Sequence, residues 1–229
     1  TTCRAGPSVQ VVNAPASRQP QRYPPPGRGA LLKWPPFECV LLNRRSQLFV
    51  TPPRWRPTRK GTTPFARGLL GSWLYEPGSL TQRLQGLYGA RFRVVLVNQT
   101  WAKPWIEESR ALGLTGGQQA LVREVLLQNG DEPVIAARSV IPKATLKGAD
   151  RRLSRLGTRP LGQILFANPR LQKCRLDITQ VPPAYWREQS AMQPVTDRTV
   201  WGRRSLYQLG HEHRLLVAEF FLPSLLTHD

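Results

Sequence analysis

Two apolar runs on either side of the tetrapeptide Gln128-Asn129-Gly130-Asp131 constrain the fold of this chain more than any other feature. The runs cover residues 121–141, and each has the length of a strand. The Asn-Gly pair between them is typical of a two-residue type I′ turn, which needs positive φ angles at both central residues. The pattern therefore predicts an antiparallel β-hairpin.

Further strands and helices follow from hydrophobic spacing along the rest of the chain. β-Branched and apolar runs predict strands at residues 92–97, 171–179, 200–209 and 215–222. Helical spacing predicts short helices at residues 69–74, 150–156 and 160–166, a helix from Ser79 to near Gly86, and a polar helix or loop at 104–117. The sum is an α+β fold, a six-stranded antiparallel sheet with inserted helices.

The chain divides by composition into an N-terminal arm and a body. The net charge is +19, but 12 of the 33 basic residues and only one of the 14 acidic residues lie in residues 1–67, together with 12 of the 22 prolines. Prolines at this density interrupt helices and remove backbone donors. We therefore predict a Pro/Arg-rich, mostly irregular arm at residues 1–53, in which residues 37–50 could form strands or pack on the body, and one domain at residues 54–229.

Several classes of protein and site have little support in the sequence. The three cysteines are far apart and have no C-x-x-C spacing, which argues against disulfides and structural zinc and favours a cytoplasmic protein. His211 and His213 lack a third spaced ligand, so we predict no metal site. The longest apolar stretch, residues 215–226, is too short to span a membrane. No nucleic-acid-binding signature accompanies the basic arm, so binding of nucleic acid is not expected.

Three ionisable side chains fall among apolar neighbours within the predicted strands: Arg123, Arg138 and Glu219. A buried guanidinium needs an anion from the protein or from a ligand, because it does not escape burial by losing its proton. Strand alternation leaves two interpretations open. One is a structural Arg123–Glu219 ion pair, and the other is a pocket in which Arg123 binds a substrate carboxylate and Glu219 a hydroxyl at the opposite end.

Six blocks of sequence, in order along the chain, resemble the landmarks of the chorismate pyruvate-lyase family, and the resemblance covers about residues 54–226. The blocks are Gly78-Ser79-Leu80-Thr81-Gln82-Arg83-Leu84, Val122-Arg123-Glu124-Val125-Leu126-Leu127, Ala137-Arg138-Ser139-Val140-Ile141-Pro142, Leu156-Gly157-Thr158-Arg159-Pro160-Leu161-Gly162, Trp201-Gly202-Arg203-Arg204-Ser205 and Ala218-Glu219-Phe220-Phe221-Leu222-Pro223.

The resemblance implies helical flaps that close over an internal ligand site. By resemblance, Arg123 binds the ring carboxylate, and Glu219 lies near the 4-hydroxyl end of the product. Main-chain amides at Leu80 and Leu161 contact the ligand, and Arg138 is expected to receive the enolpyruvyl carboxylate. Arg203 and Arg204 could either attract the anionic substrate or lie at a solvated strand end.

The reaction that the resemblance implies is elimination of pyruvate from chorismate to give 4-hydroxybenzoate for ubiquinone biosynthesis. It needs no metal or other cofactor, and the family resemblance implies a monomer in the cytoplasm. The alternative is a non-catalytic module that binds small aromatic acids, because the same architecture resembles the effector-binding domains of some bacterial transcription regulators.

Overall fold

The computed structural model describes residues 46–58, 66–148, 153, 156–187, 197–210 and 213–227, all of which belong to one compact unit, Leu41–Asp229. Within these ranges no helix has the length and apolar character to cross a membrane.

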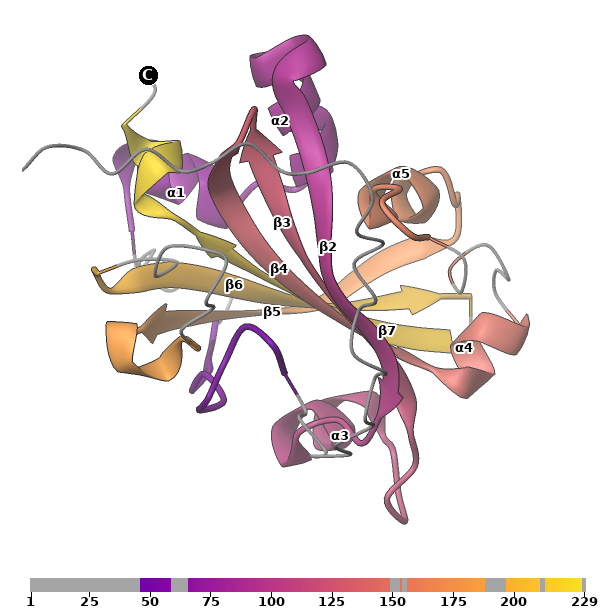
Figure 1. The fold of residues 1–229 in the computed structure, drawn as a ribbon. Helices are drawn as coiled ribbons and strands as arrows, with labels where there is room; N and C mark the ends of the chain where they lie inside the picture. Colours follow the sequence, from indigo (N-terminus) through magenta and orange to yellow (C-terminus); the bar gives the residue numbers. More distant parts are fainter. Residues whose placement is uncertain are drawn as a thin grey trace, which may run out of the picture. The chain divides into compact units, whose positions relative to one another are not determined.

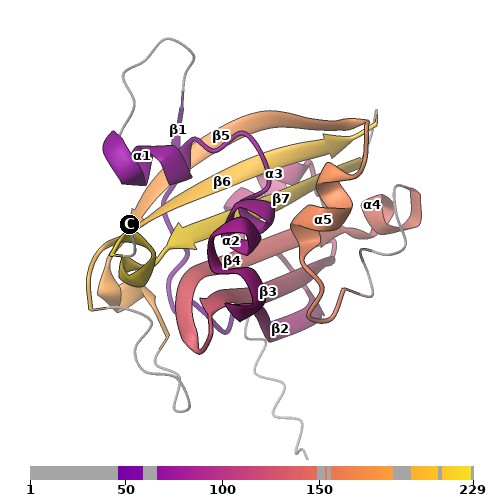
Figure 2. The same ribbon diagram turned by 90° about the horizontal axis from the view of Figure 1, so that it is seen from above.

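Seven antiparallel strands of the described residues form one sheet in the order β1-β5-β6-β7-β4-β3-β2 (Figures 1 and 2). The α+β class and the six predicted strands are confirmed. The seventh strand, β1, has only two residues, too few to show alternation in the sequence. The strands are β1 (Arg56–Pro57), β2 (Phe92–Ala102), β3 (Ala120–Asn129), β4 (Glu132–Pro142), β5 (Leu171–Val181), β6 (Val200–Leu209) and β7 (His213–Phe221).

The hairpin of β3 and β4 is confirmed, but its turn is not of the predicted type. Asn129 pairs with Glu132, so the two central residues are Gly130 and Asp131. Gly130 has a φ of +62°, and no described residue other than glycine has a positive φ. A type I′ turn is therefore excluded, and the glycine at the first central position matches the requirement of a type II′ turn.

The described part of the chain contains five α-helices: α1 (Gly68–Leu74), α2 (Leu80–Tyr88), α3 (Ile106–Leu112), α4 (Lys143–Gly148) and α5 (Leu161–Phe166). Ser79 caps α2 as predicted, because its hydroxyl accepts from the amide of Gln82. The helix continues past Gly86 and ends at Gly89, whose φ is +52°. The helix predicted at 150–156 lies largely outside the described residues.

The two faces of the sheet are covered by different elements. Helices α1, α2 and α5 lie on one face, and α3 lies on the other (Figures 1 and 2). We call the first the flap face, with α2 and α5 as its two flaps, and the second the back face. Leu48 and Phe49, which precede the predicted domain boundary, are buried in the core of the back face, where Phe49 packs against Trp186 and Phe220.

Candidate active site

A pocket lies between the sheet and the two flaps. Arg123 on β3 and Glu219 on β7 line it from the sheet, while Leu80 and Leu161 line it from the first residues of α2 and α5. The structure therefore brings together four of the five residues that the sequence predicts for the site. The fifth, Arg138, is not among the residues that line this pocket.

The floor of the pocket is formed by small side chains on β4, which lies between β3 and β7. Ser139 pairs with Arg123, and Ala137 pairs with Glu219. Paired residues in antiparallel strands point to the same face, so all four side chains face the flaps. Because Ser139 and Ala137 are short, the sheet leaves space between the cation and the carboxylate.

Arg123 is a buried cation that has no carboxylate partner among the described residues. Its side chain is 1% exposed, and Nη2 donates to the main-chain oxygens of Gly157 and Arg159 at 2.9 and 3.0 Å. Its Nε is buried and donates to no described acceptor. Burial lowers the pKa of Arg123 to about 10, so the side chain remains cationic at neutral pH. The pocket wall thus presents a positive charge that an anionic ligand would balance.

Glu219 pairs with Arg203 rather than with Arg123. Oε2 of Glu219 accepts from Nε of Arg203 at 2.7 Å, and the two residues are partners in the register of β6 and β7. The structural Arg123–Glu219 pair considered from the sequence is therefore absent. Arg203 is 1% exposed, so it is not at a solvated strand end. The alternation of side chains along residues 200–209 could have identified Arg203 as a buried residue, because it places Arg203 on the same face as Trp201 and Tyr207.

The first residues of the two flaps meet above the pocket. A Cβ atom on Gly162 would lie 2.7 Å from the hydroxyl oxygen of Ser79 and 3.1 Å from that of Thr81, so the glycine allows α5 to approach α2 closely. The first amides of a helix have no acceptor within the helix. The amides of Leu80 and Leu161 are such groups, at the two helix ends that line the pocket.

Arg138 lies on the back face, and its expected contact with a second substrate carboxylate must be corrected. Nε and Nη2 donate to Glu108 at 2.8 and 3.0 Å, Nη1 donates to Glu124 at 2.8 Å, and the guanidinium stacks on Trp105. Burial alone would lower the pKa of Arg138, but the charges and hydrogen bonds of Glu108 and Glu124 raise it. The protein therefore neutralises this arginine itself.

A β-bulge explains why the two arginines point in opposite directions. At the turn Asn129 pairs with Glu132, and continuing that register would pair Arg123 with Arg138 on one face. The register shifts between Leu127 and Gln128, so Arg123 pairs with Ser139 and Arg138 pairs with Glu124. A shift of one residue moves every following side chain to the other face.

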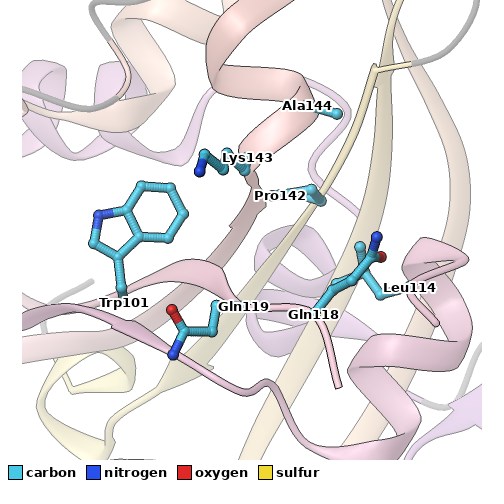
Figure 3. Close-up of a pocket in the computed structure, with 7 residues that line it drawn as sticks. All are labelled: Trp101, Leu114, Gln118, Gln119, Pro142, Lys143 and Ala144. Atoms are coloured by element: carbon cyan, nitrogen blue, oxygen red, sulfur yellow. The ribbon is translucent and has the colours of Figure 1, made fainter. Parts of the chain in front are cut away.

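A second hollow, on the surface, is larger but offers different chemistry. It is lined by Trp101, Leu114, Gln118, Gln119, Pro142, Lys143 and Ala144 (Figure 3). Its one charged lining residue, Lys143, is exposed, and no lining residue carries a carboxylate. Among the described residues there is also no group of three or more His, Cys, Asp or Glu side chains placed to hold a metal ion. The pocket beneath the flaps is therefore the candidate site.

Comparison with known families agrees with this placement. The family described as chorismate lyase matches residues 55–229, which contain all the pocket residues. The chain belongs to the chorismate lyase family.

Curated members of the chorismate lyase family are similar over most of their length. A protein of Methylococcus capsulatus named probable chorismate pyruvate-lyase is 46% identical over 68% of this chain and 96% of its own. Proteins of the same name from Thiobacillus denitrificans and Nitrosospira multiformis are 43% and 38% identical, over 69% and 75% of this chain and 84% and 94% of theirs.

Solved structures with some similarity include two transcription regulators. A GntR-family regulator of Enterococcus faecalis matches with a TM-score of 0.41 and 16% identity over 57% of this chain and 89% of its own. The C-terminal domain of the histidine utilization repressor of Pseudomonas syringae matches with a TM-score of 0.42 and 13% identity, over 58% of this chain and 93% of its own. Similarity at this level does not decide between ligand binding and catalysis.

Proposed function

We propose that this protein is a chorismate pyruvate-lyase, which converts chorismate to 4-hydroxybenzoate and pyruvate without a cofactor. The observation that carries the proposal is Arg123, a buried cation with no carboxylate partner among the described residues, in the wall of a pocket that also contains Glu219. A site built in this way suits a small anion that carries a hydroxyl group. The names of the curated relatives also support the proposal.

In this proposal the ring carboxylate of chorismate binds Arg123. Hydrogen bonds between a guanidinium and a carboxylate are among the strongest in proteins, and burial strengthens them further. Glu219 then lies at the hydroxyl end of the ring, two strands away across the floor formed by Ser139 and Ala137. The amides of Leu80 and Leu161 donate to ligand oxygens from above. Each group binds or orients the substrate, and none is a covalent nucleophile.

The reaction depends mainly on the position of the enolpyruvyl side chain relative to the ring. The C3–O bond of the enolpyruvyl ether breaks while the hydrogen on ring C4 passes to the methylene carbon, so the side chain leaves as pyruvate and the ring becomes aromatic. Because the ring C4–H and the methylene carbon belong to one molecule, holding the enolpyruvyl side chain over the ring supplies much of the rate acceleration. Glu219 can assist by a hydrogen bond as charge shifts toward the ether oxygen.

The direct test is incubation of the purified full chain with chorismate in a chelator, followed by detection of 4-hydroxybenzoate and pyruvate. We expect the two products in equal amounts, and we expect them to form at least about 100-fold more slowly with an Arg123→Met variant. Binding of 4-hydroxybenzoate without turnover would instead support a module that only binds aromatic acids. Supply of ubiquinone biosynthesis, a monomeric state and a cytoplasmic location remain predictions that belong to this proposal.

A further inference from the structure

Arg203 joins the acidic end of the pocket to the chain that leads into the first flap. Nε donates to Glu219 at 2.7 Å, while Nη1 lies 2.7 Å from the main-chain oxygen of Glu76 and 3.3 and 3.4 Å from those of Trp73 and Leu74. These three carbonyls belong to the end of α1 and the connection to α2. One buried side chain thus contacts both a pocket residue and the root of a flap.

The same connection is held at further points. Nζ of Lys173 on β5 donates to the main-chain oxygens of Glu76 and Pro77 at 3.2 and 3.3 Å. The side chain of Glu76 accepts from the amide of Gly78 at 2.9 Å and pairs with Arg83 of α2 at 3.2 Å. The segment that precedes Leu80 is therefore fixed to the sheet by Lys173 and to α2 by the ion pair of Glu76 with Arg83.

Glu219 differs from the other buried carboxylates because it lines the pocket. Its side chain is 14% exposed, and no described donor contacts Oε1. Asp177, Glu108 and Glu124, by contrast, pair with arginines on the back face. The bond from Arg203 to Oε2 therefore leaves the other oxygen of Glu219 available to a ligand.

We propose that Arg203 is a positioning residue for the reaction, which orients Glu219 toward the ligand and fixes the flap that carries the Leu80 amide. The proposal rests on the proposed function. Only a guanidinium can carry out both tasks, because Nε serves the carboxylate while Nη1 serves the carbonyls. A lysine has a single nitrogen at the end of its side chain, so it would lose one of the two contacts.

The test compares Arg203→Lys with Arg204→Lys. Arg204 is a matched control, because it is the next residue of β6, is also buried and donates to Asp177 at 2.7 and 3.1 Å, but lies on the back face. We expect Arg203→Lys to lower kcat about tenfold or more and to change the KM for chorismate less than about threefold. Arg204→Lys should change both by less than about twofold, whatever it does to stability.

A double-mutant cycle separates positioning from a general structural role. If Arg203 acts through Glu219, Arg203→Lys should lower kcat less than about twofold in a Glu219→Gln background. An equal loss of kcat in both backgrounds, or the same loss from Arg204→Lys, would overturn the proposal.

Hydrogen exchange tests the flap without any substrate, so its result does not depend on the proposed function. We expect exchange of the amides of Glu76 and Gly78, which are hydrogen-bonded in this segment, to be about tenfold faster in Arg203→Lys than in the wild type or in Arg204→Lys. Unchanged exchange there would contradict the role of Arg203 in fixing the flap. A wild-type protein that fails to turn over chorismate while this exchange difference persists would refute the lyase assignment and leave the role of Arg203 in the flap standing.

Discussion

Arg123 and Arg138 lie on neighbouring strands of one sheet, and each is only 1% exposed, yet their surroundings are opposite. On the back face, Arg138 makes three hydrogen bonds to two carboxylates, and its pKa is raised. On the flap face, Arg123 contacts two main-chain carbonyls, and burial lowers its pKa to about 10.

We interpret the difference as one between an arginine that stabilises the fold and an arginine that, in the proposed function, binds a ligand. A buried charge is costly unless it is paired, so a protein that leaves one unpaired gives up stability at that position. In the proposed function, the charge of Arg123 gains its partner when the substrate carboxylate binds. The contrast yields four predictions, which follow from the largest expected effect to the smallest.

Replacing Arg138 by methionine should destabilise the protein strongly. Glu108 and Glu124 would remain buried without a cation, and breaking a buried pair in this way costs about 3–5 kcal/mol. The free energy of unfolding, measured by chemical denaturation, reports the loss. Converting Glu108 and Glu124 to glutamine in the same protein should recover part of it. A loss below about 1 kcal/mol would mean that the back-face cluster is not a compensated unit.

Replacing Arg123 by methionine should instead leave stability nearly unchanged and remove activity. Relief of the buried charge offsets the two lost hydrogen bonds to carbonyls, so we expect the free energy of unfolding to stay within about 1 kcal/mol of the wild type. Loss of a buried charged contact to the substrate should lower kcat/KM about 100-fold or more. An active Arg123→Met variant would remove the basis for the ligand role.

Glu219→Gln should have a smaller effect on catalysis than Arg123→Met. If the carboxylate positions the substrate without transferring a proton, we expect Glu219→Gln to lower kcat about tenfold with KM changed less, because a neutral acceptor forms a weaker hydrogen bond. Glu108→Gln on the back face serves as the control for kinetics. A fall in kcat of about 100-fold or more would indicate that Glu219 transfers a proton.

The smallest predicted effect is a pH dependence of ligand affinity, which is absent near neutral pH. Arg123 is cationic below its pKa of about 10, so binding of benzoate should be constant from pH 7 to 9 and weaken as the pH rises past 10. Burial raises the pKa of Tyr207 to about 12, so this pocket residue stays neutral over that range. Titration calorimetry measures the affinity, and a Lys173→Met variant checks that the nearby amine is not responsible. Constant affinity up to pH 11 would contradict the prediction.

Hydrophobic patterning was sufficient for the strands and the hairpin, whereas the family resemblance was needed to predict that Arg123 and Glu219 share one site. Alternation is a local property, and it holds as long as a strand is regular. The bulge between Leu127 and Gln128 is not visible in composition or spacing, and it reversed the face of Arg138. Because the side-chain period is two, one extra residue turned a predicted substrate ligand into part of the back-face core.

The partner of Glu219 was missed for a different reason. Ion pairs between strands depend on which strands are neighbours, and the sequence does not state that β6 lies between β5 and β7. Once the order is known, the register places Arg203 directly opposite Glu219. The Arg-Arg pair on β6 then separates, with Arg203 at the pocket and Arg204 bound to Asp177 on the back face.

Residues upstream of the family match also donate hydrogen bonds to the buried carboxylate of Glu124 on the back face. The hydroxyl of Ser46 donates to Oε1 of Glu124 at 2.5 Å, and the amide of Gln47 donates to Oε2 at 2.7 Å. A recombinant protein trimmed to start at Trp55 would lose both donors and uncover the aromatic surface that Phe49 occupies. Aggregation of the trimmed protein would then result from the loss of these residues, and it would not indicate that the untrimmed enzyme folds poorly.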